Sequence, residues 1–189
     1  LEFAHGFLTA GGDVTTDESP DPENENQVVP PETASREGAP PIVHLVGGDD
    51  EVTAIADQIQ AWRAEAGSGE QFAVLYSSSR SVNPKRIRRE LQARGMDVFW
   101  MTDPRDRTAR DKLATSGADV VLSTTHSAKG LEFPRVVVCG LWRDEDDDVA
   151  NHMTAYVGMT RAQHHLAVVH PSGGPLADHL RGASELVSA

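Results

Sequence analysis

The chain has 189 residues with a formal net charge of −12, 39% hydrophobic and 24% charged residues, and a single cysteine, Cys139. These proportions are typical of a globular domain, and no apolar stretch approaches the roughly 20 residues that a membrane span requires. One cysteine excludes an internal disulfide framework and a zinc site built from several thiolates. We therefore expect a cytoplasmic protein with no membrane partner and no metal site of its own. Because the chain opens on Leu1, we also expect it to be a piece of a longer protein.

The negative charge is concentrated in the first part of the chain. Residues 1–70 carry 15 acidic and 2 basic side chains, whereas residues 71–189 carry 14 acidic and 15 basic ones. Five of the latter acids form one run, Asp144 to Asp148. Apart from this run, the second part has an excess of positive charge and is able to face a phosphate backbone.

The predicted elements begin with a short helix from Leu1 to Leu8, where apolar residues recur at helical spacing. Residues 13–41 are rich in Pro, Glu, Asp, Asn, Ser and Thr, a composition typical of a flexible or irregular acidic segment. We accordingly divide the chain into a partial helix and acidic linker, 1–40, and a folded domain, 41–189.

From Pro41 onward, short apolar strands alternate with helices. Two helices are predicted between the first three strands, the second capped by Asn83 and Pro84 and ended by Gly95. The expected strands are Ile42–Val46, Phe72–Tyr76, Val98–Met101, Val120–Ser123, Val136–Cys139 and Leu166–Val169. Repeated strand–helix units with fully apolar strands predict an α/β fold, a parallel sheet with helices on both faces. In such sheets the chemistry lies in loops at the carboxyl ends of the strands.

The connection between the strands at 120–123 and 136–139 is dense in polar groups. It reads Ser-Thr-Thr-His-Ser-Ala-Lys-Gly-Leu-Glu-Phe from Ser123 to Phe133. Hydroxyls, exposed N–H groups and a lysine beside a glycine suit oxyanions such as phosphates. The alternative is a solvated loop in which Thr124 and Ser127 only cap a short helix.

This segment resembles motif V of UvrD/Rep-type superfamily 1 DNA helicases, whose pattern is Thr-x-His-x-x-Lys-Gly-Leu-Glu-Phe. The matching residues are Thr124, His126, Lys129, Gly130, Leu131, Glu132 and Phe133. The resemblance implies that Thr124 and His126 contact DNA. It also implies that Gly130 and Glu132 approach the nucleotide, with Lys129 holding the loop or reaching phosphate.

The segment Tyr156 to Ala162 reads Tyr-Val-Gly-Met-Thr-Arg-Ala. Gly158 allows a close backbone approach, and Arg161 supplies a permanently charged fork that suits phosphate or pairs with a carboxylate such as Glu132. The string resembles motif VI of the same family. The resemblance implies that Arg161 is the catalytic arginine finger on the γ-phosphate of ATP, that Gly158 lies at the nucleotide and that Thr160 belongs to the DNA contacts.

Two weaker signals precede these motifs. The segment Phe72–Ser77 resembles the motif IV strand of the family, but Ser77 stands where the family commonly has arginine. The helix that follows carries four cations, Lys85, Arg86, Arg88 and Arg89, which either form a solvated face or touch a phosphate backbone. Adjacent His164 and His165 are interpreted as structural.

The resemblance implies the second RecA-like domain of an ATP-dependent DNA helicase. The sequence contains no Gly-x-x-x-x-Gly-Lys-Ser/Thr pattern, so ATP and Mg²⁺ are expected to be held mainly by an N-terminal P-loop domain of the same parent protein. Single-stranded DNA is the expected polymer partner. Residues 95–119 leave room for a short helix only, so the accessory domain of the fullest family members is not expected here. The alternative is a non-catalytic RecA-like module that binds DNA or protein.

Overall fold

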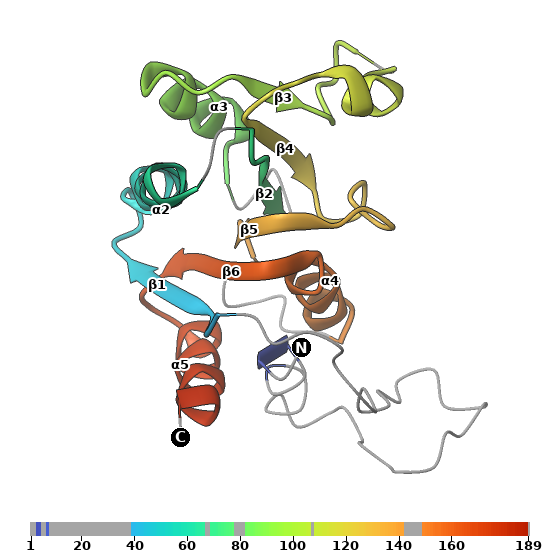
Figure 1. Cartoon of the computed structure of the whole chain (residues 1–189). Coiled ribbons are helices and arrows are strands. Elements are labelled where there is room, and N and C mark those ends of the chain that lie inside the picture. The colour runs from blue at the N-terminus through green and yellow to red at the C-terminus, as the bar shows by residue number, and fades with distance from the viewer. Residues whose placement is uncertain are drawn as a thin grey trace, which may run out of the picture.

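The sheet has six strands, and all its strand pairs are parallel. The computed structural model describes residues 3, 4, 7, 39–66, 69–77, 82–106, 108–141 and 149–188, without the side chains of 149–151 and 186–188. The strands are β1 (Ile42–Val46), β2 (Phe72–Tyr76), β3 (Val98–Trp100), β4 (Val120–Thr124), β5 (Phe133–Cys139) and β6 (Ala162–Pro171). Their order across the sheet is β1-β6-β5-β2-β4-β3 (Figure 1). The predicted α/β class and parallel sheet are confirmed.

Helices cover both faces of this sheet, as the apolar strands require (Figure 1). They are α2 (Glu51–Glu65), α3 (Pro84–Ala93), α4 (Val149–Met159), α5 (Pro175–Ser188) and the 3₁₀ helix η1 (Ala109–Thr115). On one face, α2 and α3 pack Ile59 and Ile87 against the strands. On the other, α4 and α5 contribute Met159 and Leu180. None of the helices in the described ranges combines the length and apolar character needed to span a bilayer.

Strand bounds follow the sequence closely at β1 and β2, which begin and end where predicted. In contrast, β5 starts three residues early and β6 four residues early. The reason is their mutual pairing: Phe133 lies opposite Ala162, and the register shifts before Arg135 meets His165. The strands were predicted from runs of apolar residues. Polar residues near the starts of β5 and β6 interrupt these runs, so the extensions were not predicted.

The helix α3 begins and ends as its sequence dictates. The side chain of Asn83 accepts a hydrogen bond from the amide of Lys85 at 3.0 Å, and Pro84 takes the first helical position. Gly95 then adopts a φ of +76°, a conformation that favours glycine at the end of a helix. In contrast, α5 was not predicted, although Leu176, Ala177, Leu180 and Ala183 bury one face of it at helical spacing.

Three residues near the amino terminus belong to the apolar core on the α4 and α5 face of the sheet. Phe3, Ala4 and Phe7 are helical, as predicted, and are 2%, 3% and 0% exposed. They join the same apolar cluster as α4 and α5, so this helical segment and the 41–189 domain share a core. Most of the predicted acidic linker lies outside the described residues, as does the acidic run Asp144 to Asp148.

Candidate functional site

The polar connection at 125–132 runs from the side of the sheet where the strands end to the side where they begin. It leaves the carboxyl end of β4 and enters the amino end of β5, and these strands pair with opposite sides of β2. Midway, Ala128 is fully buried in the cluster that also holds α4 and α5. The motif residues of this connection are therefore divided between two edges of the sheet.

Thr124 and His126 lie at the carboxyl end of β4. The Thr124 hydroxyl donates to the Ser127 hydroxyl at 2.9 Å and accepts a hydrogen bond from the Ser127 amide at 3.1 Å. Thr124 thus caps a local turn, as the alternative interpretation expected, although the following residues form turns and no regular helix. The His126 side chain is exposed and has no hydrogen-bond partner among the described residues. It is consequently available to an external ligand.

Glu132 and Arg161 lie at the amino ends of the adjacent strands β5 and β6. The Phe133 amide donates to the carbonyl of Arg161 at 3.0 Å, which ties the two segments together. Glu132 is exposed and accepts a hydrogen bond from the Gln163 side chain at 3.1 Å. The sequence had suggested an ion pair between Arg161 and Glu132, but the described contacts of these two residues do not include one.

The half-buried guanidinium of Arg161 is instead bonded to neutral oxygens. It donates to the carbonyls of Val157 at 3.0 Å and Leu131 at 3.4 Å, and to the Thr160 hydroxyl at 3.1 Å. These partners hold the fork at the junction of the two motif segments. None of them is a carboxylate that would neutralise its charge.

Thr160 lies beside Arg161 and apart from the other predicted DNA residues. It follows the last residue of α4, and its hydroxyl donates to the Val157 carbonyl at 3.1 Å while accepting from Arg161. Thr124 and His126, in contrast, lie at the carboxyl end of β4. The structure thus brings two of the three predicted DNA residues together and places Thr160 among the predicted nucleotide residues.

Lys129 and Gly130 lie on the exposed part of the connection. Gly130 has a φ of +81°, and a Cβ built on it would meet nothing within 4 Å. Glycine is therefore needed there for backbone conformation and not for lack of space. The Lys129 carbonyl accepts a hydrogen bond from the Arg110 side chain at 3.2 Å, a contact that the sequence did not reveal.

Gly158 is buried within α4 and touches the connection directly. A Cβ built on it would come within 3.2 Å of Thr125 Cγ2 and 3.3 Å of Thr125 Oγ1. The Thr125 hydroxyl is itself buried and has no hydrogen-bond partner in the described structure. The absence of a side chain at Gly158 thus leaves room for Thr125, and its predicted nucleotide contact remains a prediction. The contact between Gly158 and Thr125 joins the two motif segments.

Comparison with known proteins bears on this arrangement. The model of the UvrD-like helicase C-terminal domain matches residues 119–169, which include both motif segments. Residues 119–169 are thus similar to the UvrD-like helicase C-terminal domain. Among curated proteins, none matches the sequence.

Solved structures agree with this assignment at the level of the fold. The C-terminal domain of a possible DNA helicase from Lactobacillus plantarum has a TM-score of 0.61 and 18% identity, over 96% of this chain and 92% of that one. The C-terminal domain of the DEAD-box protein Dbp5 has a TM-score of 0.52 and 12% identity, over 77% of this chain and 82% of that one. The chain thus has the fold of helicase C-terminal domains.

Ser77 directly follows β2, the strand that resembles motif IV. Its amide donates to the Cys139 carbonyl at 3.3 Å, and its hydroxyl is buried without a partner among the described residues. Cys139 itself is fully buried, and burial raises the pKa of its thiol well above the usual value. A buried thiol in such an environment is unreactive.

The basic tract of α3 contributes to a pocket. Lys85, Arg88 and Arg89 line this pocket between α3 and the segment after β3. Arg88 also donates to Asp103 at 3.2 Å. Lys85, Arg86 and Arg89 are exposed, so a solvated face and contact with a phosphate backbone both remain predictions.

His165, which is half-buried, lies opposite the buried Arg135 near the amino ends of β5 and β6. Arg135 is 8% exposed and bonds to Glu65 at 3.0 Å and Glu70 at 2.8 Å. Burial, aided by Arg135, lowers the pKa of His165, whose ring lies 6.2 Å from that of Trp62. His165 thus packs against the core, in line with the structural role predicted for it.

Proposed function

We propose that this chain is the second motor domain of an ATP-dependent, single-stranded-DNA-translocating helicase, and that it supplies the arginine finger and part of the DNA track. ATP with Mg²⁺ would bind between this domain and a P-loop domain of the same parent protein. Arg161 and Glu132 would face the nucleotide, and Thr124 and His126 would face DNA. We expect this protein to work in the cytoplasm.

The proposal rests on the course of segment 125–132, which joins the carboxyl ends of the strands to their amino ends. Its first residues lie at the carboxyl end of β4, and its last residue, Glu132, lies beside Arg161 where β5 and β6 begin. A motor needs such a connection, because nucleotide state on one side must alter polymer contacts on the other. Segment 125–132 is short and packed at Ala128, so in the proposed motor it would be the physical link between the two sites.

The environment of Arg161 supports the role of a finger that is positioned before use. Its guanidinium is held by two carbonyls and a hydroxyl, and no carboxylate among its described partners offsets its charge. A γ-phosphoryl group offers more strongly charged acceptors than these neutral oxygens, so exchange of partners is favourable. In phosphoryl transfer the fork then stabilises charge on the transferring group.

Lys129 and Gly130 would complete the nucleotide side of the connection. Both are exposed, and Gly130 leaves open space where a side chain would stand. An unobstructed backbone next to a lysine suits a polyanion that enters from a second domain. Gly158 is assigned the indirect role of fixing the position of this connection through Thr125.

ATP hydrolysis by the chain and by its parent protein tests the proposal. The 189-residue chain alone is expected to show no ATPase activity with or without single-stranded DNA, because its sequence contains no P-loop. The full-length protein that includes this chain is expected to hydrolyse ATP and to be stimulated by single-stranded DNA. Turnover by the chain alone, lost on substitution of Arg161, would overturn the half-motor assignment. A full-length protein without ATPase activity would favour the non-catalytic binding module.

A further inference from the structure

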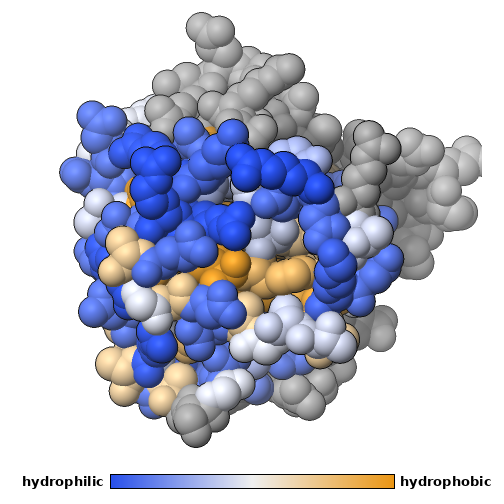
Figure 2. Space-filling model, turned by 90° about the horizontal axis from the view of Figure 1, so that it is seen from above, coloured by the Kyte–Doolittle hydropathy of each residue, from blue (hydrophilic) through white to orange (hydrophobic). Residues whose placement is uncertain are grey.

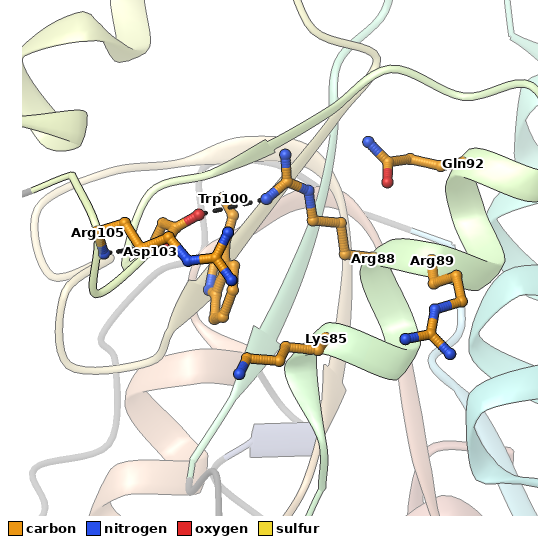
Figure 3. Close-up of a pocket in the computed structure, with 7 residues that line it drawn as sticks. All are labelled: Lys85, Arg88, Arg89, Gln92, Trp100, Asp103 and Arg105. Carbon is orange, nitrogen blue, oxygen red and sulfur yellow. Dashed lines mark hydrogen bonds and ion pairs between the residues drawn. The ribbon is translucent and has the colours of Figure 1, made fainter.

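A pocket outside the motif segments gathers cations from two elements. It lies between α3 and the segment that follows β3, and its lining includes Lys85, Arg88, Arg89, Trp100, Asp103 and Arg105. Figure 3 shows the Trp100 ring between the α3 side chains and Arg105. Figure 2 shows that hydrophilic residues predominate on the upward face of the molecule. We call the pocket between α3 and the segment after β3 the α3–β3 pocket.

The charge of the α3–β3 pocket is largely uncompensated. Its one carboxylate, Asp103, pairs with Arg88 at 3.2 Å. The other three cations, Lys85, Arg89 and Arg105, are exposed, and none of them has an ion pair within the described part of the chain. In addition, the Nε of Arg88 is buried without a hydrogen-bond partner there. Four positive side chains thus face one negative one, in a protein whose net charge is −12.

The floor of the pocket is tied to the start of the motif connection. The Trp100 indole donates to the Tyr76 hydroxyl and to the Thr102 hydroxyl, each at 3.2 Å. Tyr76 in turn lies opposite Thr124 in the sheet, and its carbonyl accepts a hydrogen bond from the Thr125 amide at 3.0 Å. The pocket and the Thr124 loop therefore lie at the same carboxyl edge, on neighbouring strands.

We propose that the α3–β3 pocket binds the phosphodiester backbone of the single-stranded DNA that also contacts Thr124 and His126. This inference rests on the proposed function and extends its DNA track across β3 to α3. Lysine and arginine side chains that carry no ion pair are the groups that neutralise backbone phosphates. Trp100 is only 9% exposed and its N–H is already used, so it forms a wall of the pocket and not a platform for base stacking. Binding here is accordingly independent of base sequence.

The salt dependence of binding measures this contribution. On single strands each neutralised phosphate adds about 0.7 to the slope of log K against log salt concentration. Three contacts therefore account for a slope of about 2, and for roughly a 100-fold difference in affinity at about 0.1 M salt. Arg88 is left unchanged in the test, because its removal would leave Asp103 without its partner.

The experiment compares two charge-matched triple variants of the 189-residue chain. The pocket variant is Lys85→Gln, Arg89→Gln, Arg105→Gln, and the control variant is Arg63→Gln, Arg86→Gln, Arg181→Gln, which removes three exposed cations outside the pocket. Binding of a fluorescent oligothymidine of about 20 nucleotides is measured by anisotropy over a range of salt concentrations, with thermal melts as a check on folding. We expect the pocket variant to lose about 2 from the salt slope and roughly 100-fold in affinity, and the control to lose far less.

Other outcomes distinguish failure of the pocket inference from failure of the proposed function. If the pocket variant binds like the control while His126→Ala binds weakly, the pocket inference is overturned and the proposed DNA track stands. Equal losses in both triple variants would reveal a general charge effect and also overturn it. Competition by inorganic phosphate at millimolar concentration would identify a small-anion site instead. A wild-type chain that does not bind the oligonucleotide at low salt overturns the pocket inference, whereas the ATPase test on the full-length protein remains decisive for the function.

Discussion

The two ends of the connection at 125–132 differ in how their key side chains are held. At the carboxyl end of β4, the His126 ring is exposed and has no recorded side-chain partner in the described structure. At the amino ends of β5 and β6, Arg161 is half-buried and held by three hydrogen bonds. His126 can therefore contact a ligand directly. Arg161 must first break existing hydrogen bonds before its guanidinium can bind a ligand.

This difference matches the demands of the two proposed ligands. A polymer that slides past requires contacts that form and break readily, and an exposed side chain meets this need. A group that stabilises a transition state must be fixed in advance, because positioning during the reaction would cost free energy. Thr125, next to His126, lies close to Gly158, three positions before Arg161, so this contact links the segments that carry the two side chains.

The largest expected effect comes from Arg161 in the full-length protein. Arg161→Ala should lower kcat for ATP hydrolysis by about 10³ or more and change the KM for ATP much less, because the fork acts on charge that develops in the transition state. Arg161→Lys should restore little, since one ammonium cannot replace the bidentate fork. Steady-state kinetics with saturating single-stranded DNA measure both values. Arg181→Ala, an exposed arginine of α5, is the control; near-normal turnover of Arg161→Ala would leave Arg161 a purely structural role.

His126→Ala should produce a smaller effect on a different quantity. The affinity for single-stranded DNA and the stimulation of ATPase by DNA should each fall about tenfold, which is the worth of one hydrogen bond to a charged group. The ATPase rate without DNA should remain nearly unchanged. Anisotropy and steady-state kinetics on the full-length protein test this, with His164→Ala as the exposed histidine control. A reduced rate without DNA would show that the two ends are not functionally separate.

Gly158→Ala tests the contact that joins the ends. Alanine usually stabilises a helix relative to glycine by up to about 1 kcal/mol, but here its Cβ would lie 3.2 Å from the Thr125 methyl. We expect a net loss of about 1 kcal/mol in the free energy of unfolding, measured by urea denaturation. Gly182→Ala in α5 is the matched control, since a Cβ there meets nothing within 4 Å. Thr125→Ser should relieve the loss in the double variant, and failure to do so would place the strain elsewhere.

The smallest expected effect is a pH dependence at the amino ends of β5 and β6. The pKa of His165 is lowered in the folded protein, so the unfolded chain binds more protons and stability rises with pH. This stability is fully present above the unfolded pKa, near 6.5, and is lost as pH falls towards the lower folded value. Urea denaturation between about pH 5 and 7.5 should show a flatter profile for His165→Gln than for wild type. His164→Gln should keep the wild-type slope, and an unchanged slope in His165→Gln would assign the dependence to another group.

The fold was predictable from the sequence because apolar strands and capped helices carry local signals. The bounds of β1 and β2, and the cap at Asn83, follow from composition alone. The extensions of β5 and β6 do not, since they depend on pairing between Phe133 and Ala162, 29 positions apart in the sequence. Arg135 was equally hidden, because its buried charge is balanced by two glutamates that lie far from it along the chain.

For the candidate site, the motif pattern identified the residues but not their spatial division. The separation of Thr124 from Thr160 depends on the path of the connection across the sheet, which no local pattern encodes. The role of Gly158 likewise required the position of Thr125. The α3–β3 pocket had a partial signal in the basic tract of α3. Arg105 joins it from a separate segment, and only the course of β3 brings the two together.

The pairing of β1 with β6 has a consequence for how the chain acquires its structure. Ile42 lies opposite Ala167, so a strand near the start of the domain completes its hydrogen bonds only when a strand more than a hundred positions later is available. Contacts of such long range slow folding, because the loop must close before the pairing stabilises it. During synthesis, the backbone groups of β1 that pair with β6 therefore lack their sheet partners until β6 has been made. Chaperones that mask exposed strands should thus influence the yield of this domain more than that of a helical bundle of equal length.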